Sequence, residues 1–319
     1  MRSSEHLRFC CPRCQQEVHR IADAYQCSHC PASYPVIAGV ADFRLWPDPY
    51  IGLEDDRRKA IHLAEQARSR SFEQMLHYYY SITPEDPPDL ASRWTAHALR
   101  EPQLASHLLN SVSLANEAGA LLDVGCSTGG LLVAASGRFS RLVGVDVALR
   151  WLVVGSVRLR ERTSNATLVC ANAEALPFAA GEFAAATATD VLEHLRDAPR
   201  ALTEVRRVLQ PRGETVWTTN NRYAPLPEPH VKLWGVGWLP RHLQASYVAW
   251  RRRDLLPYRI ALRGPAETRR LFHAAGFVQT VVSAAPLAAP ALYEHLRRLP
   301  FTAALLAGWG PKLLVQARR

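Results

Sequence analysis

The 319-residue sequence predicts an α/β fold, with a parallel sheet covered by helices on both faces and a small N-terminal domain in front of it. Two observations support this prediction. From residue 120 onward, short apolar runs alternate with helical segments, which is typical of a parallel sheet with helices on both faces. Before residue 45, four cysteines occur as two C-x-x-C pairs, which is typical of a small metal-stabilised domain. The 48% hydrophobic content suffices for one large core and a small satellite.

Each expected strand is a short apolar run, and each expected helix is the amphipathic segment that follows it. The expected strands are residues 120–124, 142–146, 167–171, 183–188 and 214–219, and the expected helices are residues 129–138, 148–161 and 197–209. Two earlier segments, residues 54–80 and 90–117, also have helical character. In a sheet of this kind, ligands bind outside the carboxyl ends of the strands. Residues that directly follow a strand are therefore the first candidates for a functional site.

The turn after the first of these strands is rich in glycine. Residues 120–130 read ALLDVGCSTGG, so Asp123 ends the apolar run and Gly125 and Gly129 follow it. Small residues let the backbone approach a ligand closely, at the N-terminus of the next helix. The following strand ends in Asp146, and a carboxylate about 20 residues after such a turn binds the hydroxyls of a ribose. These features fit either a dinucleotide or S-adenosylmethionine.

Two further motifs decide between the cofactors. Residues 170–178 read CANAEALPF, and residues 183–195 read FAAATATDVLEHL. Together with the two preceding motifs, in this order and spacing, they resemble the class I S-adenosylmethionine-dependent methyltransferases of type 11. Residues 209–214 and 275–277 resemble the turns before the fifth and sixth strands of that family. The resemblance implies a Rossmann-like, seven-stranded mixed sheet with helices on both faces, and methyl transfer from S-adenosylmethionine.

The resemblance also implies roles for individual residues. It places the methionine part of the cofactor at Asp123, Gly125, Cys126 and Gly129, the ribose at Asp146, the adenine at Asn172 and Ala173, and the junction with the acceptor at Thr189 and Asp190. The family has aspartate where this chain has Asn172, and an asparagine oxygen can still accept a hydrogen bond from the adenine amino group. The family also has aspartate at the position of Ala184, which we interpret as structural.

The N-terminal cysteines predict a metal site. Cys11, Cys14, Cys27 and Cys30 have the spacing of a zinc ribbon that holds one tetrahedral Zn²⁺ through four thiolates. Because protein fills all four positions, the ion is expected to be structural and to supply the folding energy of the ribbon. We expect Cys10 to be a bystander. Disulfides are the alternative, but the chain starts without an apolar signal segment, so a cytoplasmic location is expected.

The segment YPVIAGVADF, residues 34–43, resembles Trm112-like zinc ribbons that are fused to methyltransferases or partnered with them. The chain is therefore divided into a zinc ribbon (1–47), a helical linker and active-site cap (48–117) and a methyltransferase domain (118–319). Residues 221–263 break the alternation of strands and helices, and we expect them to form the substrate-specific insertion. No apolar run is long enough to span a bilayer.

Positive charge is concentrated late in the chain. Residues 200–319 contain 19 lysines and arginines and 6 acidic residues, whereas residues 1–199 contain 19 and 23. Tryptophans are interleaved with this charge in the insertion. Such a surface fits RNA, the surface of an anionic membrane, or a small acidic or phosphate-bearing acceptor. A merely solvated basic surface is a fourth interpretation.

Methyl transfer needs an acceptor atom aligned with the methyl group and, for many acceptors, a group that removes a proton. The candidate bases are Asp190, His194 and His230. We expect a small-molecule acceptor from biosynthetic tailoring or a glycan, methylated at oxygen. The alternatives are a methyltransferase of ribosomal or transfer RNA, and a catalytically silent methyltransferase-like subunit that stabilises or recruits a partner.

Overall fold

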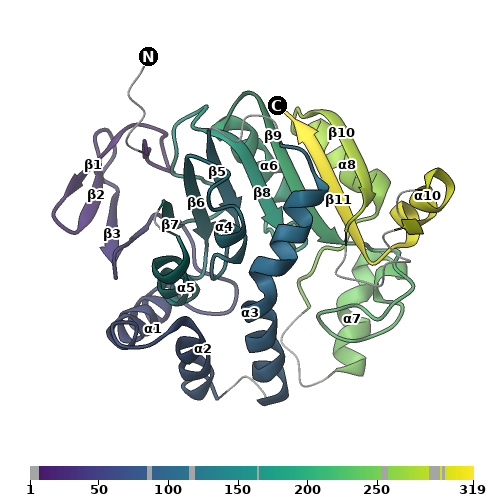
Figure 1. Ribbon diagram of the computed structural model, residues 1–319, viewed down its shortest axis with the longest axis horizontal. Coiled ribbons are helices and arrows are strands. Elements are labelled where there is room, and N and C mark those ends of the chain that lie inside the picture. Colours follow the sequence, from purple (N-terminus) through teal and green to yellow (C-terminus); the bar gives the residue numbers. More distant parts are fainter. Residues whose placement is uncertain are drawn as a thin grey trace.

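Five apolar runs of the sequence form the parallel part of a central sheet (Figure 1). The structure, a computed structural model, describes residues 7–84, 88–114, 119–163, 165–252, 258–286, 295–296 and 299–319. The strands of the central sheet are β5 (Ala120–Val124), β6 (Arg141–Asp146), β7 (Ala166–Cys170), β8 (Phe183–Thr189), β9 (Leu209–Asn220), β10 (Val278–Ala284) and β11 (Lys312–Arg318). β9 starts earlier than the expected strand at 214–219, because it includes the turn expected at residues 209–214, where Arg212 has φ +64°.

The seven strands lie in the order β7-β6-β5-β8-β9-β11-β10. Neighbouring strands from β7 to β9 are parallel, whereas β11 runs antiparallel to both β9 and β10. This is the seven-stranded mixed sheet that the resemblance implies. The order changes direction at β5, which pairs with β6 on one side and β8 on the other. The carboxyl ends of these three strands therefore meet where a ligand is expected to bind.

The N-terminal cysteine domain extends this sheet. Its strands are β1 (Val18–Ile21), β2 (Ala24–Cys27), β3 (Ser33–Ile37) and β4 (Val40–Asp42). The strand β4 pairs in parallel with β7, placing Asp42 opposite Cys170, so one sheet contains 11 strands. Because β4 covers the edge of β7, it satisfies backbone groups that would otherwise be open to another chain.

Helices cover the sheet on both faces. They are α1 (Leu53–Gln66), α2 (Phe72–Ser81), α3 (Pro88–Ser111), α4 (Gly130–Ala134), α5 (Leu149–Arg162), α6 (Ala198–Val208), α7 (Arg241–Arg251), α8 (Pro265–Ala274) and α10 (Pro300–Trp309). Leu121 belongs to a core cluster that includes residues of α1 to α5. Its neighbour Leu122 belongs to a second cluster, which includes residues of α6 and α8. This alternation follows from the two-residue period of a strand. The helix α3 crosses one face of the sheet (Figure 1).

Two expected helices differ in the structure. The segment 54–80 is split into α1 and α2, since Ser71 forms a capping box with Gln74 and starts a new helix. The helix expected at 129–138 ends at Ala134, and Gly137 adopts φ +80° in the turn toward β6. None of the helices that the structure describes is long and apolar enough to cross a membrane.

The insertion after β9 forms a small structure of its own. It contains a 3-10 helix, η1 (Val236–Trp238), and α7, which pack around Val231, Leu233 and Val248. The elements α7 and α10 lie at the same end of the molecule (Figure 1). Residues 253–257 of the insertion lie outside the described part of the chain, so Arg253 is not placed.

Candidate active site

The glycine-rich turn follows β5 directly. It has no space for a side chain at Gly125. This residue has φ +71°, and a Cβ atom there would lie 2.3 Å from Cγ2 of Val191. The backbone N–H groups of Gly125 and Cys126 both donate to the carbonyl of Val145, at 2.7 and 3.0 Å. The turn is therefore tied to β6 and can approach a ligand through its backbone.

Asp146 fixes the other side of this turn. Its Oδ2 accepts the N–H of Ser127 at 2.9 Å, and its Oδ1 accepts the N–H of Ala148 at 2.8 Å. Each carboxylate oxygen has a second acceptor position. Asp146 can therefore still accept hydrogen bonds from two neighbouring hydroxyls, as the ribose hypothesis requires. Gly129 precedes α4 with φ +78° and completes the turn.

Asp123 lies buried at the end of β5. It accepts a hydrogen bond from Oγ1 of Thr187 at 2.9 Å. Burial raises the pKa of this carboxyl group well above its usual value, and the charges of Glu101 and Asp146 raise it further. The site thus concentrates acidic groups beneath the turn, which suits the cationic amino-acid end of S-adenosylmethionine.

Glu101 is a site residue that the sequence did not reveal. It projects from α3 onto Gly130, where a Cβ atom would lie 2.4 Å from its carboxyl carbon. Its Oε2 accepts hydrogen bonds from Thr128 at 3.3 Å and from Arg158 at 2.7 Å. Since α3 precedes the first parallel strand and has no recognisable motif, only the fold brings Glu101 to the turn.

Cys126 contributes its backbone to the turn, while its side chain packs inward. The thiol is buried, and its sulfur would lie 2.6 Å from a Cβ atom placed on Gly144 of β6. Burial raises the pKa of this thiol well above its usual value. The sulfur therefore behaves as a small apolar group, and Gly144 leaves the space that it fills.

Asn172 has partners that the sequence did not predict. Its Oδ1 accepts the backbone N–H groups of Leu45, at 2.8 Å, and Trp46, at 3.4 Å, and its Nδ2 donates to the carbonyl of Trp46 at 3.2 Å. The carboxamide therefore binds the segment that leaves the cysteine domain. Aspartate could not donate to the Trp46 carbonyl, which gives a physical reason for asparagine at this position. The neighbouring Ala173 is half-buried against the core.

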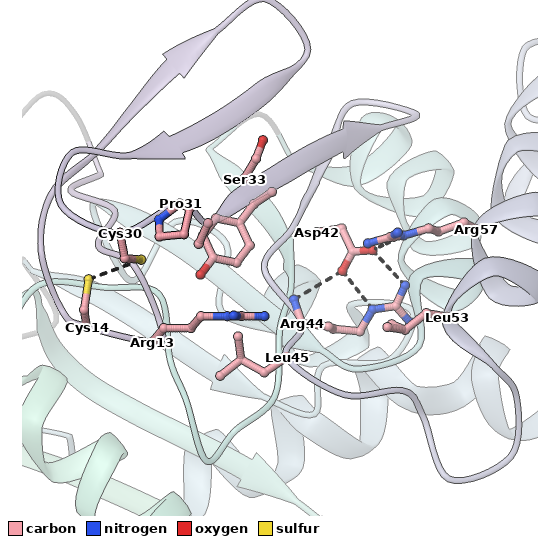
Figure 2. Close-up of a pocket in the computed structure, with 12 residues that line it drawn as sticks. Arg13, Cys14, Cys30, Pro31, Ser33, Asp42, Arg44, Leu45, Leu53 and Arg57 are labelled. Atoms are coloured by element: carbon pink, nitrogen blue, oxygen red, sulfur yellow. Dashed lines mark hydrogen bonds and ion pairs between the residues drawn. The ribbon is translucent and has the colours of Figure 1, made fainter.

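The segment that leaves the cysteine domain is also held by a buried ion network around Arg44. Figure 2 shows the part of this network formed by Asp42, Arg44 and Arg57. Arg44 pairs with Asp42 through two hydrogen bonds, of 2.8 and 2.9 Å, and with Asp56 of α1 at 2.6 Å. Arg150 of α5 binds Asp56 at 3.0 Å and Asp48 at 2.9 Å. Charges removed from water in this way require such pairing. The network thereby joins the N-terminal domain, α1 and α5.

The four expected metal ligands converge at one point. The sulfur pairs Cys11–Cys30, Cys14–Cys27 and Cys14–Cys30 are separated by 3.7, 3.5 and 3.7 Å. A tetrahedral zinc with Zn–S bonds of about 2.3 Å requires sulfur separations of about 3.8 Å. Figure 2 shows Cys14 and Cys30 facing each other. The geometry of the four sulfurs thus fits a zinc ion.

Cys10 is turned away from these four sulfurs. Its thiol donates to the carbonyl of Phe178 at 3.0 Å, and burial raises its pKa to about 11. A pocket of about 560 Å³ opens between the cysteines and the ion network, with Arg13, Ser33 and Arg57 in its lining (Figure 2). No residue of the expected cofactor or catalytic set lines this pocket, so it is not the methyl-transfer site.

Thr189 and Asp190 end β8 on the side of the glycine-rich turn. Asp190 has φ +56°, and its backbone N–H donates to the carbonyl of Thr218 at 3.0 Å. Its side chain is paired with Lys312 at the start of β11 and accepts a hydrogen bond from Thr218 at 3.4 Å. Both oxygens of the Asp190 carboxylate are therefore engaged by protein groups, Lys312 and Thr218.

His194 and His230 are 36 residues apart in the sequence, and the fold brings them into contact. Their Nε2 atoms lie 3.2 Å apart. On the other side of its ring, His230 Nδ1 is paired with Glu228, a buried carboxylate that also accepts the backbone N–H groups of His230 and Val231. Desolvation by the surrounding protein lowers the pKa of His194, although the charge of Glu193 opposes this effect.

A sheet in this order, with a glycine-rich turn after β5 and a carboxylate at the end of β6, is the Rossmann-like fold of class I S-adenosylmethionine-dependent methyltransferases. Residues 122–217 match the profile of the methyltransferase domain family. The match begins in β5 and ends in β9, so it contains the turn, Asp146, Asn172 and the Glu193–His194 pair. His230 and the cysteine domain lie outside it.

Three known proteins illustrate the similarity. The malonyl-[acyl-carrier protein] O-methyltransferase of Methylovorus sp. is 29% identical over 137 residues, which are 40% of this chain and 46% of that protein. The ubiquinone/menaquinone biosynthesis C-methyltransferase UbiE of Shewanella oneidensis is 38% identical over 103 residues, 30% of this chain and 39% of that protein. The chain thus spans less than half the length of either relative. A solved methyltransferase from Mesorhizobium loti has a TM-score of 0.48 and 21% identity, and the match covers 66% of this chain and 95% of the other.

Proposed function

We propose that the protein transfers a methyl group from S-adenosylmethionine to an oxygen atom of a small-molecule acceptor. The observation that carries this proposal is the contact between His194 and His230, with Glu228 behind His230. An oxygen acceptor must lose its proton, and an oriented imidazole is the most common group for this purpose. The two curated relatives are an O- and a C-methyltransferase, so similarity alone leaves the acceptor atom open.

The cofactor would be held by the residues of the turn and by Asp146. Asp146 accepts hydrogen bonds from the ribose, and Asp123 and Glu101 face the cationic methionine end. When bound, S-adenosylmethionine supplies an electrophilic methyl group. Because both ends of the Asn172 carboxamide are engaged with residues 45 and 46, the adenine amino group is recognised by other atoms in this proposal.

His230 acts as the base through Nε2. Glu228 accepts a hydrogen bond from Nδ1–H of His230, so Nε2 of the neutral ring carries no proton and can accept one. The negative charge of Glu228 then stabilises the imidazolium that forms. Since Glu228 is itself held by two backbone N–H groups, at 2.9 and 2.7 Å, the ring has a fixed orientation.

The test uses tritiated methyl groups on S-adenosylmethionine and offers two acceptor pools separately, the small molecules of a cell extract and the RNA of the same cells. We expect the wild-type protein to label a small molecule, and His230→Ala to reduce the rate by about 10²–10⁴-fold, the usual contribution of a general base. The affinity for S-adenosylmethionine, measured by calorimetry, should not change. His242→Ala, an exposed histidine of α7, is the matched control. Label found only in RNA, or a His230→Ala variant with unchanged rate, would refute the proposal.

The four cysteines hold one structural Zn²⁺ in this proposal. The sulfur separations fit a tetrahedral ion, and all four ligands come from protein, which leaves no position for a reacting water. Since β4 pairs with β7, the ion also supports an edge of the methyltransferase sheet. Its role is therefore to stabilise the fold around the segment that Asn172 and Arg44 hold.

The partner of the insertion is an anionic membrane surface in this proposal. The insertion tryptophans Trp234, Trp238 and Trp250 are 61%, 49% and 66% exposed, and Trp309 of α10 is 49% exposed. Residues 229–252 contain no acidic residue but four lysines and arginines. Exposed indoles with basic neighbours suit the headgroup region of an anionic bilayer. An acceptor with an apolar tail would then reach the site from the membrane.

A further inference from the structure

We propose that Glu193, His194 and His230 bind a divalent transition-metal ion, at a site separate from the four cysteines. One ligand atom from each residue lies within 4.8 Å of the other two. Two imidazole nitrogens and one carboxylate oxygen form a donor set suited to Zn²⁺ and Fe²⁺. Binding of the ion does not depend on the reaction. Only its role in the deprotonation of the acceptor rests on the proposed oxygen acceptor.

The two imidazoles already have the spacing that a metal ion requires. Their Nε2 atoms are 3.2 Å apart, and the rings are inclined by 79°. A tetrahedral ion with Zn–N bonds of about 2.0–2.1 Å holds two nitrogen ligands about 3.3 Å apart. A direct hydrogen bond between the rings has a similar length, so the protonation of each ring must be considered.

The contact with Glu228 favours a ligand role for His230. The carboxylate accepts a hydrogen bond from Nδ1–H, so Nε2 of the neutral ring has a free lone pair on the side that faces His194. A metal-binding histidine typically donates its other N–H to a carboxylate, which fixes the tautomer and increases the basicity of the ligand atom. Because Glu228 is buried and held by the N–H groups of His230 and Val231, this arrangement is built into the insertion.

Glu193 supplies the negative charge that a cation needs. The side chain is fully buried, and it accepts hydrogen bonds from Thr219 at 2.7 Å and from the Asn220 side chain at 2.6 Å. Among the residues that the structure describes, no lysine, arginine or histidine forms an ion pair with this carboxylate. Arg263 and His194 interact with this carboxylate electrostatically without a direct ion pair, and a divalent ion would offset its charge at bonding distance.

Three protein ligands leave at least one position open on the ion. Open coordination is typical of a catalytic site, in contrast to the closed set of four cysteines. An acceptor hydroxyl bound to the ion would lose its proton more readily, because the ion stabilises the oxygen anion. With the ion bound, Nε2 of His230 is a ligand and does not act as a base, and the proton of the acceptor hydroxyl passes to solvent water.

The experiment counts metal ions in the full-length protein. The protein is treated with a mild chelator, dialysed against Zn²⁺, freed of excess metal and analysed by mass spectrometry. We expect two ions per chain in the wild type and in His242→Ala, and one in His230→Ala and in His194→Gln. Glu228→Gln should retain the site but raise its Zn²⁺ dissociation constant about 10–100-fold. Circular dichroism checks that each variant is folded.

The outcomes separate this proposal from the proposed function. A single ion in the wild type, lost with Cys27→Ser, would overturn the metal site. If His230→Ala then still slowed methyl transfer, His230 would act as a base without a metal ion, and His194 would only contact its ring. A second ion that survives in both histidine variants would also overturn the assignment. A second ion lost only in those variants, with no methyl transfer detected at all, would support the site and refute the function.

Discussion

Asn172 binds the backbone of Trp46 through both ends of its carboxamide, at 3.4 Å from the Trp46 N–H and 3.2 Å from its carbonyl. The two residues belong to different parts of the chain: Asn172 follows β7, and Trp46 follows the cysteine domain. The contact thus places the exit of that domain directly over the carboxyl edge of the methyltransferase sheet. It also explains why the amide replaces the aspartate that is usual in the family.

Asn172→Asp should destabilise the protein. The variant cannot donate to the Trp46 carbonyl, and a buried group left without its hydrogen bond costs about 1–3 kcal/mol. We expect a decrease of that size in the free energy of unfolding, measured with urea. Asn110→Asp, at an exposed position of α3, serves as the control. An unchanged midpoint for Asn172→Asp would show that the contact contributes nothing.

Asp42→Asn should break the buried ion network. Burial alone would raise the pKa of Asp42, but the hydrogen bonds and charges of Arg44 and Arg57 hold it below its usual value. Removing one partner of a buried pair costs about 3–5 kcal/mol. Asp55→Asn, at an exposed pair with Arg58, should cost less than about 1 kcal/mol.

The effect of Asp42→Asn should depend on pH. Because the folded protein lowers the pKa of Asp42, this stabilisation is complete above the unfolded value of about 3.9 and is lost as the pH falls through the lower folded value. The difference in unfolding free energy between wild type and variant should therefore be constant from pH 7 to about 5 and decrease below about 4. A difference that grows toward acid pH would contradict the assignment.

Gly125→Ala should weaken cofactor binding. The new Cβ atom would lie 2.3 Å from Val191, and the backbone would have to leave φ +71°. We expect the affinity for S-adenosylmethionine to fall at least about tenfold in calorimetry, since the turn must shift to make room for the alanine side chain. Gly181→Ala has a similar φ, +70°, but nothing within 4 Å. It should cost about 1–2 kcal/mol of stability and leave the affinity unchanged.

Cys27→Ser should release the structural zinc and weaken the sheet edge. We expect one metal ion fewer per chain and reduced protection of the β7 amides in hydrogen exchange, because β4 pairs with β7. Cys10→Ser should retain the ion, since the sulfur of Cys10 is bonded to the Phe178 carbonyl. Full metal content in Cys27→Ser would refute the four-thiolate site.

Binding to membranes should depend on the tryptophans of the insertion. We expect sedimentation with vesicles of phosphatidylcholine and phosphatidylglycerol, but not with phosphatidylcholine alone, and weaker binding at high salt. Trp250→Ser combined with Trp234→Ser should lose this binding. Trp94→Ser, an equally exposed tryptophan of α3, should retain it. Salt-sensitive binding to bulk RNA, without any to vesicles, would instead favour the RNA alternative.

The sequence by itself determined the parallel strands, the glycine-rich turn, Asp146 and the cysteine spacing. These features depend on local periodicity and on short motifs, which act within a few residues. It also identified His194 and His230 separately, as candidates with different expected roles. Neither the spacing nor the composition of the chain indicated that their rings would meet.

Only the tertiary structure decided the contacts between distant segments. It joined β4 to β7, placed Glu101 of α3 on the turn, bound Trp46 to Asn172, and brought His230 within 3.2 Å of His194. Each contact links residues more than 25 positions apart, and no local rule specifies such pairs. They depend on which surfaces the complete sheet and its helices leave facing each other, because burial and hydrogen bonding are satisfied only for the chain as a whole.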